Sequence, residues 1–306
     1  MITLREAISA SGQSLTAVAS AIGVSAAQMS RVAAHDYKDW EQKEKEFIEA
    51  MVRQGLLSKD DAMLEQTRRP TGQLFLDPAK FVVTANSMEL DGVAKDLLDP
   101  ATTLNASIGV VYGRAGYGKT TAIKHFCATN PKAIYILFVE GYTMNMMMKA
   151  IAREFGQVPC GTFDRNLDLI RQATAVYRRL ICIDEADHMP LKVLETIRGI
   201  NEVCGVPVLL VGEYGLQAKM GALPRLESRI RARPVEFTPL QPMDVVSYYQ
   251  QAVGIDLSGD DKVAKALLKR SHGDFRLLAN DAHQLVNIMN ANGVRDITKE
   301  VLDALR

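Results

Sequence analysis

Hydrophobic residues follow two alternating patterns through the middle of this chain. Short apolar runs, typical of strands buried on both faces, occupy residues 108–112, 133–139, 180–183, 206–211 and 235–237. Between them, apolar residues recur at helical spacing around residues 120–128, 145–155, 166–177 and 191–203. This alternation predicts an α/β fold in which helices cover both faces of a parallel sheet.

The beginning of the chain carries helical patterns only. In residues 1–57, one apolar helical face ends at Gly23, a stop signal, and Ser25 is placed to cap the helix that follows. This second helix would present three polar side chains, those of Gln28, Ser30 and Arg31. The outline predicts a helix-turn-helix domain, whose second helix would enter a major groove of DNA.

Further domain boundaries follow from shifts in composition. Residues 58–80 are polar and predict a linker, so the α/β domain would extend from 81 to 239. After Pro239 the strand patterns stop, and helical patterns recur around residues 243–252, 262–271, 275–291 and 298–305. Residues 240–306 therefore predict a small all-helical C-terminal domain.

A glycine-rich segment, VVYGRAGYGKTTAIKHF, lies between a predicted strand and a predicted helix. It matches the P-loop pattern G-x-x-x-x-G-K-[ST], whose backbone N–H groups cradle the phosphates of a nucleotide. The expected contacts to ATP are Gly113, Arg114, Ala115, Gly116, Tyr117, Gly118, Lys119, Thr120 and Thr121. Lys119 would reach the β- and γ-phosphates, and the Thr120 hydroxyl would bind Mg²⁺. The alternative is a glycine-rich turn with a chance lysine.

A second segment, RRLICIDEADHMP, raises several possibilities: a metal site, an acid/base pair, the DEAD tetrapeptide of an RNA helicase, or a strand that ends in a polar turn. Beside a P-loop, Asp184 is expected to hold Mg²⁺ through water, from a strand adjacent to the P-loop strand. Glu185 would then activate or orient the attacking water. Asp187 and His188 would cap the following turn, reach solvent, or join the site. A DEAD helicase would need a second sheet domain, which the patterns do not predict.

These two motifs, with the strand ending at Val211 and the C-terminal helices, resemble the AAA+ ATPases. Within that family, a helix-turn-helix followed by a compact AAA+ module, the phrase IDEADHM and the chain length resemble the transposition B proteins of Mu-type phages. The resemblance implies an oligomeric, Mg²⁺-dependent ATPase that assembles on double-stranded DNA largely without regard to sequence. It also implies capture of target DNA, stimulation of a transposase, and ATP hydrolysis that resets the assembly, which would be a ring or a filament.

The resemblance also implies roles for further residues. The segment GDFR is similar to the sensor 2 motif, which would bring Arg276 from the helical lid to the γ-phosphate. Arg229 is expected to be a catalytic arginine finger acting on a neighbouring subunit, with Arg225 and Arg231 as alternatives. These arginines would otherwise form a solvated or DNA-binding basic face. Glu213 occupies the sensor 1 position, where the family usually has a neutral polar residue, so slow or gated hydrolysis is expected.

Charge bears on where DNA would bind. The 36 basic and 36 acidic residues of the 306-residue chain give a formal net charge of zero, so DNA affinity must come from local patches. Residues 1–57 hold more acidic than basic side chains, so the helix-turn-helix would bind DNA weakly or dock a protein instead. Lys149 and Arg153 of the α/β domain are alternative DNA contacts.

Two other functions stay open at this point: a helicase loader or replication initiator, and a nucleotide-gated regulator that uses its helix-turn-helix to find an operator. Composition predicts a cytoplasmic protein, and the resemblance to phage proteins implies that the cytoplasm is that of a bacterial host cell. The four cysteines form no Cys-x-x-Cys pair, which is typical of a reducing interior. Apolar runs are too short for a signal peptide or a membrane span.

Overall fold

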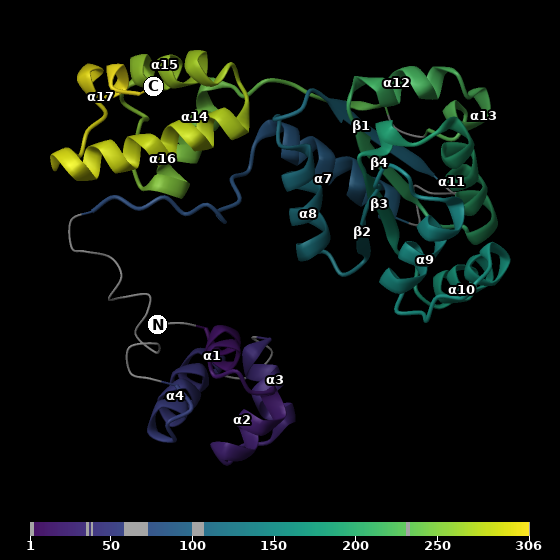
Figure 1. The fold of residues 1–306 in the computed structure, drawn as a ribbon, viewed down its shortest axis with the longest axis horizontal. Coiled ribbons are helices and arrows are strands. Elements are labelled where there is room, and N and C mark those ends of the chain that lie inside the picture. Colours follow the sequence, from purple (N-terminus) through teal and green to yellow (C-terminus); the bar gives the residue numbers. More distant parts are fainter. Residues whose placement is uncertain are drawn as a thin grey trace. The chain divides into compact units, whose positions relative to one another are not determined.

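The structure, a computed structural model, describes residues 3–34, 37, 39–57, 73–99, 107–230 and 233–305 (Figure 1). The chain divides into two compact units, Met1–Gln73 and Leu74–Arg306. Each unit has its own hydrophobic core, and each is described by itself below.

The first unit is a small helical domain. Its helices are α1 (Leu4–Ala10), α2 (Leu15–Ala21), α3 (Ala26–Ala33) and α4 (Trp40–Arg53). The Ser25 hydroxyl caps α3 by accepting a hydrogen bond from the Gln28 N–H at 3.1 Å, as the sequence predicts. The side chains packed in the core come from all four helices and include Leu4, Val18, Met29, Val32, Phe47 and Met51.

A five-stranded parallel sheet forms the centre of the second unit, which confirms the predicted α/β class. Its strands are β1 (Ile108–Gly113), β2 (Ala133–Leu137), β3 (Leu180–Asp184), β4 (Val208–Gly212) and β5 (Val235–Phe237). They lie in the order β2-β3-β4-β1-β5. The expectation that the strand ending in Asp184 is adjacent to the P-loop strand is therefore wrong, because β4 lies between them.

Although β4 lies between them, the ends of β1 and β3 can contribute to one site. The carboxyl ends of parallel strands meet at the same edge of a sheet, and neighbouring strands lie only about 4.8 Å apart. Strand β4 pairs with both of the other strands: Val208 is in register with Ile108 of β1 on one side and with Ile181 of β3 on the other. A site formed by the ends of β1 and β3 would therefore include the end of β4 between them.

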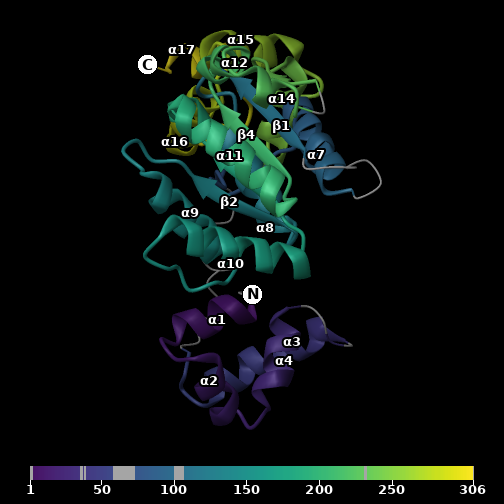
Figure 2. The same cartoon turned by 90° about the vertical axis from the view of Figure 1, so that its right-hand side faces the viewer.

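Helices cover both faces of the sheet because alternate residues of each strand point to opposite faces (Figures 1 and 2). One face packs against α7 (Ala85–Leu98) and α8 (Lys119–Thr129). The other face is covered by α9 (Met144–Glu154), α10 (Phe163–Val176), α11 (Leu191–Cys204), α12 (Tyr214–Gly221) and α13 (Pro224–Glu227). In β1, Val110 enters the second of these cores and Val111 enters the first.

The C-terminal helices pack around a separate hydrophobic core. They are α14 (Pro242–Tyr248), a π-helix (Tyr249–Val253), α15 (Asp261–Ser271), α16 (Phe275–Asn292) and α17 (Lys299–Asp303). Leu74 and Leu76 of the predicted linker also pack on this core. The Asn290 side-chain amide both accepts from the Leu74 N–H, at 2.8 Å, and donates to the Leu74 carbonyl, at 2.9 Å. Residues 58–72 of that linker lie outside the described residues.

Arg179 connects the edge of the sheet to the helix beside it through hydrogen bonds. The Arg179 guanidinium donates to the carbonyls of Pro131 at 3.1 Å, Glu154 at 2.8 Å and Ala133 at 3.3 Å. It also lies 5.9 Å from the centre of the Phe155 ring. A rigid fork of donors suits this three-way contact, and a lysine ammonium does not reproduce it.

Arg179→Ala is expected to lower the free energy of unfolding by about 2 kcal/mol, since charge-assisted hydrogen bonds contribute most when they satisfy backbone carbonyls. Arg171→Ala is the matched control, because that exposed arginine forms a surface ion pair with Asp168. Urea unfolding of both variants measures the difference. Equal stability of the two variants would contradict the structural role of Arg179.

Candidate functional site

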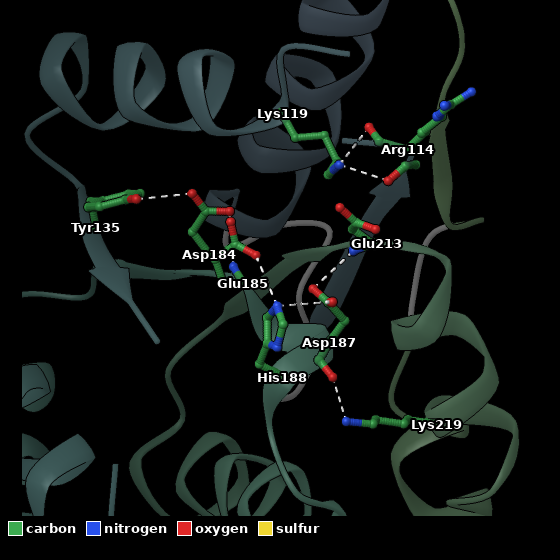
Figure 3. A network of polar contacts seen from close by, with 10 residues as sticks. Arg114, Lys119, Tyr135, Asp184, Glu185, Asp187, His188, Glu213 and Lys219 are labelled. Carbon is green, nitrogen blue, oxygen red and sulfur yellow. Dashed lines mark hydrogen bonds and ion pairs between the residues drawn. The ribbon is translucent and has the colours of Figure 1, made fainter. Parts of the chain in front are cut away.

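The P-loop lies at the carboxyl end of β1 and runs directly into α8. Gly116 and Gly118 have φ values of 85° and 91°, a left-handed conformation that only glycine adopts easily. The Lys119 ammonium is turned back over the loop, donating to the carbonyls of Gly113 at 2.7 Å and Arg114 at 3.0 Å (Figure 3). Burial lowers the pKa of Lys119, while nearby carboxylates oppose that shift.

A cleft with an empty volume of about 510 Å³ opens above this loop. Four parts of the second unit line it: the P-loop with α8, the end of β3, the end of β4 and the start of α16. The lining residues are Ala115, Gly116, Gly118, Lys119, Thr120, Thr121, Asp184, Glu185, Gly212, Glu213, Phe275 and Arg276. The structure thus brings most of the predicted nucleotide contacts together around one cavity, Arg276 included.

Asp184 is almost fully buried at the end of β3. One carboxylate oxygen accepts a hydrogen bond from the Tyr135 hydroxyl and the other accepts from the Glu185 N–H, each at 3.0 Å (Figure 3). Burial first, and the Asp184 charge next, raise the pKa of Tyr135, so the tyrosine stays a donor. The two hydrogen bonds therefore fix the orientation of the Asp184 carboxylate.

The donor set of the cleft fits Mg²⁺. The Thr120 hydroxyl and the Asp184 carboxylate line the same cavity, and hard oxygen ligands are those that Mg²⁺ prefers. Tyr135 is absent from the sequence-based predictions. It lies on β2, in register with Cys182 of β3, and only the pairing of those strands reveals its role.

Glu185, which follows Asp184, has an unusual backbone conformation. Its φ of 57° and ψ of 34° place a non-glycine residue in the left-handed region, which costs about 1–2 kcal/mol. The side chain lines the cleft and is half-buried. Burial, followed by the charges of Asp184 and Asp187, raises the pKa of Glu185. A carboxylate of raised pKa at this position suits proton acceptance from water.

Asp187 ties the acidic segment to the end of β4. Its carboxylate accepts from the Glu213 N–H at 3.0 Å, and Gly212 allows this approach because a Cβ there would lie 2.5 Å from the Asp187 oxygen. Lys219 donates to the Asp187 carbonyl (Figure 3). It also donates to the Met189 carbonyl. Asp187 therefore fixes the end of β4 beside the acidic segment.

His188 reaches solvent, as one of the sequence alternatives has it. Its Nε2 lies 3.6 Å from a Glu185 oxygen and 3.7 Å from an Asp187 oxygen. Glu213, in the predicted sensor 1 position, lines the cleft with its backbone N–H held by Asp187. The cleft thus carries a third acid close to the place where the γ-phosphate is expected.

The start of α16 contacts the P-loop directly. The Phe275 N–H donates to the Gly116 carbonyl at 2.8 Å. Asp274 caps α16, its carboxylate accepting from the N–H groups of Arg276 at 2.7 Å and Leu277 at 3.3 Å. These contacts place the Arg276 side chain in the lining of the cleft. Asp274 is a further residue that sequence reasoning missed.

A second, more apolar pocket adjoins the cleft and shares Gly118, Thr121, Phe275 and Arg276 with it. Its other walls come mainly from apolar and aromatic side chains, among them Pro78, Phe81, Val82, Tyr117, Phe237 and Tyr248. An apolar pocket beside a phosphate-binding loop suits the base of a nucleotide. Tyr117, predicted as a nucleotide contact, lines this pocket instead of the cleft.

Arg229 lies away from the cleft of its own chain. Its carbonyl accepts from the Ile108 N–H at the amino end of β1, whereas the P-loop follows the carboxyl end of that strand. Its guanidinium pairs with Glu202 at 3.1 Å. Arg225 is exposed on α13, and Arg231 lies outside the described residues. An action of Arg229 on a neighbouring subunit stays a prediction.

The predicted DNA contacts belong to both units. On α3, the Gln28 amide donates to the Tyr37 hydroxyl at 3.2 Å, and the Arg31 guanidinium lies 5.4 Å from the Tyr37 ring centre. Ser30 is exposed on the same helix. On α9, Arg153 is exposed and Lys149 half-buried. DNA binding by these residues stays a prediction.

Among the helices that the structure describes, none is both long and apolar enough to cross a membrane.

Comparisons with known proteins agree with this geometry. Residues 102–220 match the family model of an AAA domain. The chain is 27% identical over 214 residues to the Mu-like prophage FluMu DNA transposition protein B of Haemophilus influenzae, covering 67% of this chain and 72% of that protein. It is 29% identical over 143 residues to the ATP-dependent target DNA activator B of Escherichia phage Mu, 43% of this chain and 45% of that protein.

A potential ATP-binding protein of Staphylococcus aureus is 30% identical over 137 residues, which cover 42% of this chain and only 50% of that protein. Among solved structures, Cdc6p of Pyrobaculum aerophilum superposes with a TM-score of 0.56 at 15% identity, over 75% of this chain and 73% of that one. The Aeropyrum pernix ORC1 protein in complex with DNA gives 0.55 at 20% identity, over 75% and 66%. At these identities the likeness concerns the fold alone.

Proposed function

We propose that this chain, which matches an AAA domain over residues 102–220 and is similar to the Mu-type transposition protein B, hydrolyses Mg²⁺-ATP while assembled on double-stranded DNA. The observation that carries the proposal is the single cleft in which Lys119, Asp184, Glu185 and Arg276 meet. Three separate parts of the unit supply these side chains, namely the start of α8, the end of β3 and the start of α16, and together they provide groups that phosphoryl transfer requires.

Each side chain has a distinct part in this proposal. The N–H groups of the P-loop and the start of α8 bind the phosphates, and the Lys119 ammonium leaves its two carbonyl partners to reach them. Thr120 and Asp184 would hold Mg²⁺, which neutralises charge on the phosphate oxygens. Tyr135 keeps the Asp184 carboxylate oriented. Glu185 accepts a proton from the attacking water or orients it.

Arg276 joins the C-terminal helices to the nucleotide. Its guanidinium, carried by the capped start of α16, stabilises negative charge on the γ-phosphate. Arg276→Ala is expected to weaken ATP binding or turnover by about tenfold or more and to leave ADP affinity nearly unchanged. Arg276→Lys keeps the charge without the planar fork and should recover part of the loss. Competition titrations with ATP and with ADP measure the difference between the two effects.

The same nucleotide cycle would control binding to DNA. Two relatives of this chain are named as target DNA activators or transposition proteins, which supports target-DNA capture and stimulation of a transposase as the biological use. Contacts to DNA phosphates from residues such as Lys149 and Arg153 would be largely independent of sequence. In an oligomer, Arg229 of one subunit would leave Glu202 and complete the site of the next, and hydrolysis would reset the assembly.

Retention on plasmid DNA with and without nucleotide tests this function. We expect stable complexes with ATP, weak ones with ADP, and continuous coverage of the DNA in footprints at low salt. Equal retention with and without nucleotide would contradict the proposal. A discrete protected site would indicate a sequence-specific regulator instead.

A further inference from the structure

The two carboxylate oxygens of Asp274 lie in different surroundings. One carboxylate oxygen caps α16 by accepting from the N–H groups of Arg276 and Leu277. The other lies against the P-loop: a Cβ built on Gly116 would meet the Asp274 Oδ2 at 1.8 Å. A glycine is therefore required at position 116 for the carboxylate to rest on the loop, in addition to the positive φ of that residue.

The segment that carries Asp274 is fixed from both sides. On the P-loop side, the Phe275 N–H donates to the Gly116 carbonyl at 2.8 Å. On the other side, the Leu240 N–H donates to the Gly273 carbonyl at 3.0 Å, and a Cβ on Gly273 would lie 2.5 Å from the Cβ of Pro239. The carboxylate therefore follows α16, and it touches the P-loop only while α16 is docked there.

Capping does not explain why an acid stands at this position. Asparagine and serine cap helices about as well as aspartate does, and neither carries a charge. Here the negative charge rests on the loop whose N–H groups would attract the phosphates of a nucleotide. Like charges disfavour each other strongly in a partly buried site.

We propose that Asp274 sets the nucleotide affinity of the cleft: its charge, placed on the P-loop by the docked α16, weakens the binding of a di- or triphosphate. The proposal rests on the proposed nucleotide binding. It makes affinity depend on the position of the C-terminal helices, because withdrawal of α16 removes the repulsion. Arg276, on the same turn, supplies the opposing attraction at the γ-phosphate, so the segment favours ATP over ADP.

Asp274→Asn tests the proposal, because it removes the charge and keeps the cap. We expect the Kd for ADP and for ATP, measured by titration with fluorescent nucleotides, to fall by about tenfold. The melting temperature without nucleotide should stay unchanged. Asp260→Asn is the matched control: Asp260 caps α15 by accepting from the Val263 N–H, and Asp274, not Asp260, is the acid that lies against Gly116. Its nucleotide affinities should equal those of the wild type.

A role in capping alone predicts a different result, in which Asp274→Asn leaves both affinities unchanged; that result, or weaker binding, would overturn the proposal. If Asp274→Asn lowers the melting temperature, Asp274→Ser takes its place with the same expected gain in affinity. Wild-type and Lys119→Ala proteins are titrated alongside. Absence of binding to the wild type would contradict the proposed function itself, whereas wild-type binding with no gain in Asp274→Asn would contradict only this inference.

Discussion

Glu185→Gln is expected to lower the rate of ATP hydrolysis by about 100- to 1,000-fold while leaving ATP bound, since general-base catalysis contributes on that scale. Glutamine has the shape of glutamate but does not accept a proton from water. The neighbouring hydrogen bond from the residue 185 N–H to Asp184 is kept, so the site should stay assembled. Steady-state phosphate release gives the rate, and titration with a fluorescent ATP analogue gives the affinity.

Glu140→Gln serves as the control, because Glu140 is exposed in the loop after β2 and does not line the cleft. We expect it to hydrolyse ATP at the wild-type rate. The Glu185→Gln protein should also stay longer on DNA in the presence of ATP, because the step that resets the assembly is slowed. Hydrolysis at the wild-type rate by Glu185→Gln would show that another group activates the water.

Lys119→Ala is expected to weaken ATP and ADP binding by about 100-fold or more and to abolish ATP-dependent retention on DNA. The Lys119 ammonium lies over the P-loop and donates to two of its carbonyls. An ion pair between this ammonium and the phosphates, in a partly buried site, contributes about 2–4 kcal/mol to binding. Calorimetric titration with each nucleotide, followed by DNA co-sedimentation, measures both effects.

Lys124→Ala is the matched control on the same helix, since Lys124 is exposed and lies 5.3 Å from the Tyr135 ring centre, outside the cleft. Its affinities should remain within about twofold of the wild type. Unchanged nucleotide affinity in Lys119→Ala would place the nucleotide somewhere other than the P-loop.

Much of the fold could be predicted because the three central strands of this sheet, β1, β3 and β4, are buried on both faces. A run such as residues 206–211 must then be apolar throughout, and the observed strand Val208–Gly212 differs from it by one or two residues at each end. The order of the strands could not be predicted in this way. Pairing depends on the path of each crossover, so the sequence order of β1 and β3 did not reveal that β4 lies between them.

The candidate site was predictable where a local motif carries the chemistry. The P-loop and the acidic end of β3 are each continuous in sequence, and the GDFR segment pointed to Arg276. Tyr135 was not predictable, because its contact with Asp184 depends on the register between two strands. Asp274 was missed for a similar reason: its approach to Gly116 depends on how helices far along the chain dock on the P-loop.

Calorimetric titration of the purified chain with ADP and with a non-hydrolysable ATP analogue, in the presence of Mg²⁺, tests the central claim most directly. We predict saturable binding of one nucleotide per chain for both ligands, lost in the Lys119→Ala variant. Absence of heat and of binding for either nucleotide in the folded wild-type protein would contradict the account of the cleft, and with it the proposals on hydrolysis and DNA assembly.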